Sequence, residues 1–145
     1  GDASDRLNSI FSDLTSGKKA EMGDIEINKR SLRVKGAVEG VLYCGFDVLC
    51  FQPRSASDYT QIAKEYSAVL IDELPQMDGS MEDGARRFIT MVDEFYDRNI
   101  KLILAADAPM DALYIGRKLA FEFQRTLSRL IEMQSEDYLA REHRP

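Results

Sequence analysis

Apolar residues recur at helical spacing in three stretches of the chain. Residues 4–15 place apolar side chains at positions i, i+3, i+4 and i+7, and this pattern stops near Gly17. Residues 82–98 carry one apolar stripe with charges opposite and predict the clearest helix. Residues 56–66 follow Ser55, a residue type suited to an N-cap, and predict a third helix. The stripes consist of Leu7, Ile10, Phe11 and Leu14; of Tyr59, Ile62, Ala63 and Tyr66; and of Ala85, Phe88, Ile89, Val92, Phe95 and Tyr96.

Runs of β-branched and aliphatic residues lie between these helices and predict strands. Residues 25–46, interrupted by Gly36 and Gly40, predict a meander of short strands. Residues 67–71 and 101–106 predict two more strands, and the helix over 82–98 joins them. A strand, a long helical crossover and a second strand form a βαβ unit, which is parallel and almost always right-handed.

The C-terminal part reads as helical from Asp111 onward, although residues 119–123 also fit a strand. The expected fold class is α/β: a mixed sheet with a parallel βαβ unit, flanking helices and an N-terminal β-meander. At 145 residues the chain has the length of one domain. Its expected parts are a helix over 1–16, a meander over 25–51, an α/β core over 54–109 and a helical C-terminus over 110–143.

The amino-acid composition argues against several classes of function. The chain is 44% apolar and 30% charged, so it can bury a core, and it has neither a stretch long enough to span a membrane nor a visible signal peptide. A net charge of −6 argues against a nucleic-acid surface. The basic stretch over 29–35 lies in a predicted hairpin, where we expect a solvated strand face.

The residues available for chemistry are few. Cys44 and Cys50 lie in apolar contexts without CxxC spacing, which favours a reduced, cytoplasmic protein. The single histidine, His143, lies at the C-terminus, where we expect a frayed end, and this argues against histidine-based triads and zinc sites. Any chemistry must therefore use carboxylates and arginines.

An apolar run over 67–73 ends in Asp72 and Glu73, as in P-loop ATPases, where a strand of this kind supplies the acid that holds Mg²⁺. With Asp107 after the next strand, three carboxylates could meet at one sheet edge and bind Mg²⁺. The alternative, which we favour, is that they cap helices and face water. No phosphate-binding G-x-x-x-x-G-K-[ST] loop occurs, and the chain begins without Met, so we expect a fragment of a longer protein.

Two arginine pairs are candidate phosphate contacts. Arg86 and Arg87 begin the helix over 82–98, but Glu82 and Asp83 lie four residues before them, and such pairing explains these arginines adequately. Arg125 and Arg129 lie four apart on one helix, where like charges repel. Either Glu122 and Glu132 offset this repulsion or an anion binds between the arginines. We expect the aromatic residues Tyr43, Phe46, Phe51, Phe121 and Phe123 to be core residues, not a platform for bases.

Four blocks of sequence together resemble the AFG-one-like ATPases. They are SDLTSGKKA (12–20), YCGFDVLCFQPRSASDYTQIAKEYSAVLI (43–71), ARRFITMVDEFYDRNIKLILAADAP (85–109) and LAFEFQRTLSRLIEMQSEDYLAREH (119–143). The resemblance implies a relationship to AAA+/P-loop NTPases, with the P-loop and the magnesium-binding acid upstream of this chain. ATP and Mg²⁺ would then serve the full-length protein and not this fragment alone. Within the matching blocks, Arg86, Arg87, Arg125 and Arg129 are the arginines to which a role can be transferred.

The same resemblance implies a bacterial, cytoplasmic protein linked to cell division and to the division-ring protein, whereas mitochondrial relatives act in respiratory-chain turnover. It also implies that Asp72 and Glu73 are not the family's principal magnesium-binding pair. Three readings follow: the C-terminal part of an ATPase packed against its upstream nucleotide-binding half, a module that docks protein clients, and a self-contained Mg²⁺-dependent phosphatase. The third has little support, since no nucleophile or base accompanies the carboxylates.

Overall fold

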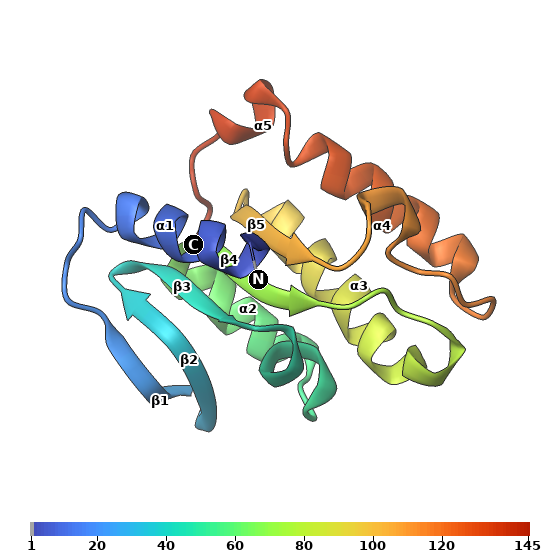
Figure 1. The fold of residues 1–145 in the computed structure, drawn as a ribbon, viewed down its shortest axis with the longest axis horizontal. Coiled ribbons are helices and arrows are strands. Elements are labelled where there is room, and N and C mark those ends of the chain that lie inside the picture. The colour runs from blue at the N-terminus through green and yellow to red at the C-terminus, as the bar shows by residue number, and fades with distance from the viewer. Residues whose placement is uncertain (1) are drawn as a thin grey trace.

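The computed structural model describes residues 2–145 and contains one five-stranded sheet covered by helices on both faces (Figure 1). The strands follow one another across the sheet in chain order. They are β1 (Glu21–Ile27), β2 (Arg30–Val38), β3 (Gly40–Gly45), β4 (Tyr66–Leu74) and β5 (Lys101–Ala106). β1, β2 and β3 pair antiparallel, whereas β3, β4 and β5 pair parallel. The predicted fold class, a mixed sheet with an N-terminal meander and a parallel βαβ unit, is confirmed.

Two crossovers build the parallel half of the sheet. The predicted unit is β4, α3 (Glu82–Asp97) and β5. A second unit, which the sequence pattern did not reveal, runs from β3 through α2 (Ala56–Glu65) to β4. Because β3, β4 and β5 run parallel, their carboxyl ends all lie at the same end of the sheet.

The two faces of the sheet are covered differently. α1 (Asp2–Leu14) packs Leu7 against Tyr43, Leu70 and Ala105 on one face. The opposite face carries the larger core, in which α2, α3 and α4 (Ala120–Glu132) bury their apolar stripes. The short helix α5 (Glu136–Leu139) follows α4, and its Tyr138 is fully buried in the larger core.

The predicted helices over 4–15, 56–66 and 82–98 are confirmed to within about two residues, and residues 120–123 are helical rather than extended, with Leu119 as the N-cap of α4. The helical structure expected from Asp111 onward is wrong for residues 113–119. After the 3-10 turn η3 (Met110–Ala112), the chain extends beside Met77, whose N–H donates to Leu113 O at 2.7 Å and whose carbonyl accepts from Ile115 N. These contacts hold residues 113–119 out of a helix.

The meander also ends sooner than expected over 25–51. β3 stops at Gly45, and residues Asp47–Phe51 form a single π-helical turn, η1. A further 3-10 turn, η2 (Gly79–Met81), leads into α3. Among the helices of residues 2–145, none combines the length and hydrophobicity needed to cross a bilayer.

Candidate functional site

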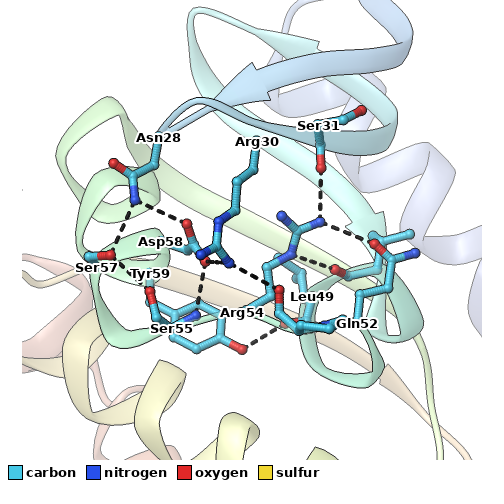
Figure 2. A network of polar contacts seen from close by, with 12 residues as sticks. Asn28, Arg30, Ser31, Leu49, Gln52, Arg54, Ser55, Ser57, Asp58 and Tyr59 are labelled. Atoms are coloured by element: carbon cyan, nitrogen blue, oxygen red, sulfur yellow. Dashed lines mark hydrogen bonds and ion pairs between the residues drawn. The ribbon is translucent and has the colours of Figure 1, made fainter.

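Three side chains from different elements hold the π turn η1. A single helical turn leaves its last carbonyls without partners inside the helix. Arg54 Nε donates to Val48 O at 3.0 Å, Tyr59 Oη to Leu49 O at 2.7 Å, and Arg87 Nη1 to Cys50 O at 3.0 Å. Figure 2 shows Arg54 and Tyr59 pointing into this turn from the loop before α2 and from α2 itself. The turn therefore fixes two guanidinium groups in place.

A shallow depression of about 240 Å³ lies over this arrangement. Arg54, Arg86, Arg87, Asp83 and Tyr59 line it, together with Ala56 and Thr90. Within residues 2–145, none of the three arginines forms an ion pair: Arg54 and Arg87 donate to carbonyl groups and to the Gln52 amide, and the Arg86 side chain makes no hydrogen bond. Three guanidinium groups thus line the depression together with one carboxylate, that of Asp83. We call Arg54, Arg86 and Arg87 the arginine cluster.

The remaining polar groups beside the cluster do not titrate near neutral pH. Burial raises the pKa of the Cys50 thiol to about 12, although the Tyr59 hydroxyl and the two nearby guanidinium charges act in the opposite direction. Burial likewise raises the pKa of Tyr59. A protonated thiol is a weak nucleophile, so the depression can bind an anion but supplies neither a nucleophile nor an acid–base pair.

A buried carboxylate anchors the elements that carry the cluster. Asp58 is fully buried; its carboxylate accepts from Ser55 N at 2.9 Å, Asn28 Nδ2 at 3.1 Å and Arg30 Nη1 at 3.2 Å (Figure 2). These bonds tie the β1–β2 turn to the first turn of α2. Arg54 Nη2 also donates to Ser31 O at 3.1 Å and so joins the same layer. These hydrogen bonds position the arginine cluster and have no other role in the candidate site.

The basic stretch over 29–35 is an exposed strand face, as predicted. Arg30 pairs with Asp58, Arg33 with Asp24 at 3.0 Å, and Lys35 with both Asp72 and Glu73. With most of its charge matched to carboxylates, this face presents no concentrated positive patch.

The three carboxylates considered for Mg²⁺ do not gather. Asp72 lies inside β4, is buried, and accepts hydrogen bonds from Ser4, Lys35 and the Glu73 N–H at 2.8 to 3.0 Å. Glu73 is exposed, binds Lys35 at 2.9 Å and occupies the left-handed region with φ 58° at a register shift in the strand. Asp107 is exposed and sits beyond the shift. Within residues 2–145, no group of three His, Cys, Asp or Glu side chains could hold a metal ion.

The local pairing predicted for Arg86 and Arg87 is wrong. Glu82 does not meet Arg86; it accepts instead from Tyr114 Oη at 2.8 Å, which draws the 113–119 segment onto the start of α3. Arg87 turns away from Asp83 toward the carbonyl of Cys50, and Arg86 projects into solvent. Helix periodicity could not reveal this, because the accepting carbonyl comes from a turn 37 residues away.

The partners predicted for Arg125 and Arg129 are also wrong. Both arginines bind one carboxylate on the neighbouring helix, Asp93 of α3: Arg125 Nη2 lies 3.1 Å from Asp93 Oδ2, and Arg129 Nη1 contacts Oδ1. Arg129 also stacks 4.9 Å from the centre of the Tyr96 ring. The pair therefore fastens α4 to α3, and its charge is partly offset without a bound anion.

His143 does not lie on a frayed end. Its Nε2 atom contacts Ala63 O at 2.5 Å, so the C-terminal residues fold back onto α2. Both cysteines are buried free thiols, as their apolar contexts suggested. Among the aromatic residues expected in the core, Phe51 and Phe121 are exposed, the latter to 83%.

Arg54 is the functional candidate that sequence reasoning missed. It follows Pro53 in a loop and belongs to no periodic pattern. Its location inside the block YCGFDVLCFQPRSASDYTQIAKEYSAVLI was the only signal that could have singled it out.

The described residues do not fit a complete Mg²⁺–nucleotide site. A phosphate cradle needs glycines that leave backbone N–H groups open, but the connection from β4 to α3 is closed by its own side chains. Asp78 accepts from Ser80 N at 2.8 Å there, and the next glycine, Gly84 inside α3, is covered by the ring of Phe51 from η1.

Comparison with known proteins gives a consistent result. The chain matches the AFG1-like ATPase family over residues 1–142. It is 43% identical over 138 residues to the cell division protein ZapE of Escherichia coli (strain K12), covering 95% of this chain and 37% of that protein. It is 29% identical over 171 residues to lactation elevated protein 1 homolog B of Danio rerio, covering 94% and 34%. The chain thus spans little more than a third of these relatives. No solved structure matches it significantly.

Proposed function

This chain belongs to the AFG1-like ATPase family, and from that membership we propose that it is the C-terminal part of a longer, AAA+-type P-loop ATPase. In this proposal the ATP- and Mg²⁺-binding residues lie upstream, in the part of the relatives that this chain does not cover. The 145-residue chain alone then lacks ATPase activity. The match to a protein named for cell division supports a role in that process. The proposal adds the bacterial cytoplasm at the division site as the location and the division-ring protein as the partner.

The observation that carries the proposed phosphate role is the arginine cluster, none of whose members forms an ion pair within residues 2–145. The chain as a whole is acidic, with a net charge of −6, yet this one depression gathers three guanidinium groups. A guanidinium group donates paired hydrogen bonds to phosphate oxygens and keeps its charge at any physiological pH. Because Arg54 and Arg87 are already fixed by carbonyls, little further ordering is needed when an anion binds. We therefore assign the cluster the role of binding phosphate charge in the assembled ATPase.

One observation favours the alternative, a surface that docks protein clients. Phe121 is 83% exposed and lies one turn before Arg125, whose side chain is 61% exposed. An exposed aromatic ring beside an arginine is a frequent core of protein interfaces. In this alternative α4 recognises an acidic and apolar segment of a client, and Arg125 and Arg129 contribute binding but no catalysis.

ATP turnover by the full-length protein tests the proposal. The variant to compare with wild type is Arg86→Ala, because Arg86 is exposed, lines the depression and makes no side-chain hydrogen bond to any of residues 2–145. Arg117→Ala is the matched control, since Arg117 is also exposed and lies outside the depression. We expect Arg86→Ala to lower turnover at least tenfold while Arg117→Ala leaves it unchanged.

The second arm of the test measures client binding by the double variant Phe121→Ala, Arg125→Ala. If this pair abolishes client binding and Arg86→Ala leaves turnover intact, the chain is a docking module and its arginine cluster has no role in hydrolysis. If the full-length protein has no ATPase activity at all, the proposal fails at its first step.

A further inference from the structure

An apolar groove runs along the free edge of the sheet. β5 pairs with β4 on one side and, within residues 2–145, with no strand on the other. The groove has a volume of about 590 Å³, and residues 102–106 of β5 form its floor. α1 lines one wall, and the 108–113 segment with the end of α4 and α5 lines the other. Apart from Arg6 and Gln134, every lining side chain is Ala, Leu, Ile or Met.

An edge strand of this kind is an acceptor for another strand. Its outward backbone N–H and C=O groups have no strand partner, and uncovered edges are ordinarily protected by charge, proline or a bulge. β5 is KLILAA and carries none of these devices after Lys101. The shape and the chemistry of the groove therefore fit an extended, apolar segment that adds to the sheet and buries its alternate side chains on both walls.

The path of α1 indicates where such a segment originates. α1 lines the wall of the groove beside β5 with Ala3, Leu7 and Ile10. Nearer its C-terminal end, the ring of Phe11 packs 5.3 Å from Tyr43 of β3 and covers Gly36 of β2. α1 thus crosses the sheet from the β5 edge toward β2 (Figure 1). A helix that starts at one strand and crosses the face of a sheet is how parallel strands are connected.

We infer that the residues immediately preceding α1 in the full-length protein form a sixth strand, which pairs with β5 and fills the groove. This inference rests on the proposed function, because it requires the upstream part that the longer relatives contain. The docking is intramolecular, and the short connection to α1 gives the strand a high effective concentration at the groove. It would join the upstream ATPase half and this chain through one continuous sheet.

Hydrogen–deuterium exchange on residues 100–107 tests the inference, with the 145-residue chain and the full-length protein measured side by side. We expect the outward amides of β5 to exchange rapidly in the 145-residue chain and at least 100-fold more slowly in the full-length protein. A photo-crosslinking amino acid at Ala106 should react with the residues just upstream of α1 in the same chain.

Two variants localise the effect. Leu139→Asp places a charge in the wall of the groove at a residue that is 44% exposed, and Ile115→Asp places one at a residue that is 57% exposed outside the groove. Leu139→Asp should remove the protection in the full-length protein and Ile115→Asp should preserve it. Neither should shift the thermal unfolding of the 145-residue chain, so loss of protection cannot be attributed to misfolding.

Several results would overturn the inference. Equal exchange in both proteins would mean that the groove stays empty, and protection of the 145-residue chain that grows with concentration would assign the groove to a second copy. A crosslink from Ala106 to any segment other than the one before α1 would also overturn the inference. Turnover measured on the same full-length sample keeps the two proposals apart, since protection without ATPase activity would contradict only the proposed function.

Discussion

At the scale of single residues, the arginines differ in the atoms that accept their hydrogen bonds. Arg125 and Arg129 share the carboxylate of Asp93, which offsets part of their charge. Arg54 and Arg87 donate to main-chain carbonyls, which fix the guanidinium groups but leave their charge in place. Only the second kind of contact both orients an arginine and keeps it available to an anion.

Replacement of Asp93 should therefore affect stability and not anion binding. In Asp93→Ala two guanidinium groups lose their shared partner and repel each other, so we expect a loss of about 1–3 kcal/mol in the free energy of unfolding. The control is Asp83→Ala, an exposed carboxylate on the same helix with no ion pair, which should cost less than about 0.5 kcal/mol. Urea denaturation measures both. Equal losses would show that the α3–α4 contact does not depend on this carboxylate.

Asp72 should govern the acid limit of stability. Burial alone would raise its pKa, but hydrogen bonds from Ser4, Lys35 and the Glu73 N–H outweigh that effect and hold the pKa below its ordinary value of 3.8. A carboxyl with a lower pKa in the folded state stabilises the fold fully above its unfolded pKa and loses this contribution as pH falls through the folded value.

Asp72→Asn should accordingly flatten the fall in stability below about pH 4, besides destabilising the chain at neutral pH, since Lys35 loses a partner. Glu73→Gln is the control, because the Glu73 side chain is 70% exposed and lies on the other side of Lys35. Thermal unfolding between pH 2 and pH 7 provides the comparison. An Asp72→Asn profile as steep as that of wild type would show that another carboxyl sets the acid limit.

At the scale of elements, the π turn η1 and the start of α2 are held by bonds that arrive from distant segments. Asp58 receives Asn28 and Arg30 from the β1–β2 turn, and η1 receives Arg87 from α3. The meander, the turn and two helices are thereby joined beneath the arginine cluster. A mutation that loosens this layer should weaken anion binding because it displaces the guanidinium groups of the cluster, and not because it changes their charge.

Asp58→Ala measures how strongly this buried carboxylate holds the layer together. It leaves Arg30 and Asn28 without their buried acceptor and removes the side-chain contact to Ser55 N, so we expect a loss of about 3–5 kcal/mol. Asp24→Ala breaks only the exposed pair with Arg33 and should cost less than about 1 kcal/mol. Chemical denaturation checks both values. A small loss in Asp58→Ala would mean that water readily replaces the carboxylate.

The elements also show where sequence patterns are sufficient. α2 and α3 follow from apolar periodicity because their buried faces are continuous, α1 follows from the same periodicity although only Leu7 of its stripe is buried, and β5 follows from its unbroken aliphatic run. The 113–119 segment and η1 do not, because backbone pairing to Met77 and side chains from α2 and α3 decide their conformation. No local period encodes a partner that lies tens of residues away.

The same limit applies to the candidate site. Arg86 and Arg87 stood out by position on a helix, whereas Arg54 joins them only through the fold. Conversely, Arg125 and Arg129 stood out in the sequence as a like-charged pair. The structure shows that both bind the carboxylate of Asp93 on α3, which offsets part of their charge. The sequence could indicate arginines of interest, but only the arrangement in space separates those with carboxylate partners from those without.

At the scale of the whole molecule, an acidic chain holds one positive depression on one side of its sheet and one open apolar edge at β5. The first suits a phosphate group and the second suits a strand from the upstream half. Both features are what the proposed arrangement requires, in which this chain is a piece of a larger ATPase.

The most direct test of the arginine cluster is a pyrophosphate titration of the ¹⁵N-labelled 145-residue chain, followed by NMR. We expect weak, salt-sensitive binding, with shift changes centred on Arg54, Arg86 and Arg87 and an affinity that falls at least threefold in Arg86→Ala but not in Arg117→Ala. Shift changes spread over other basic residues, or an affinity unchanged by Arg86→Ala, would contradict the assignment of this depression to phosphate.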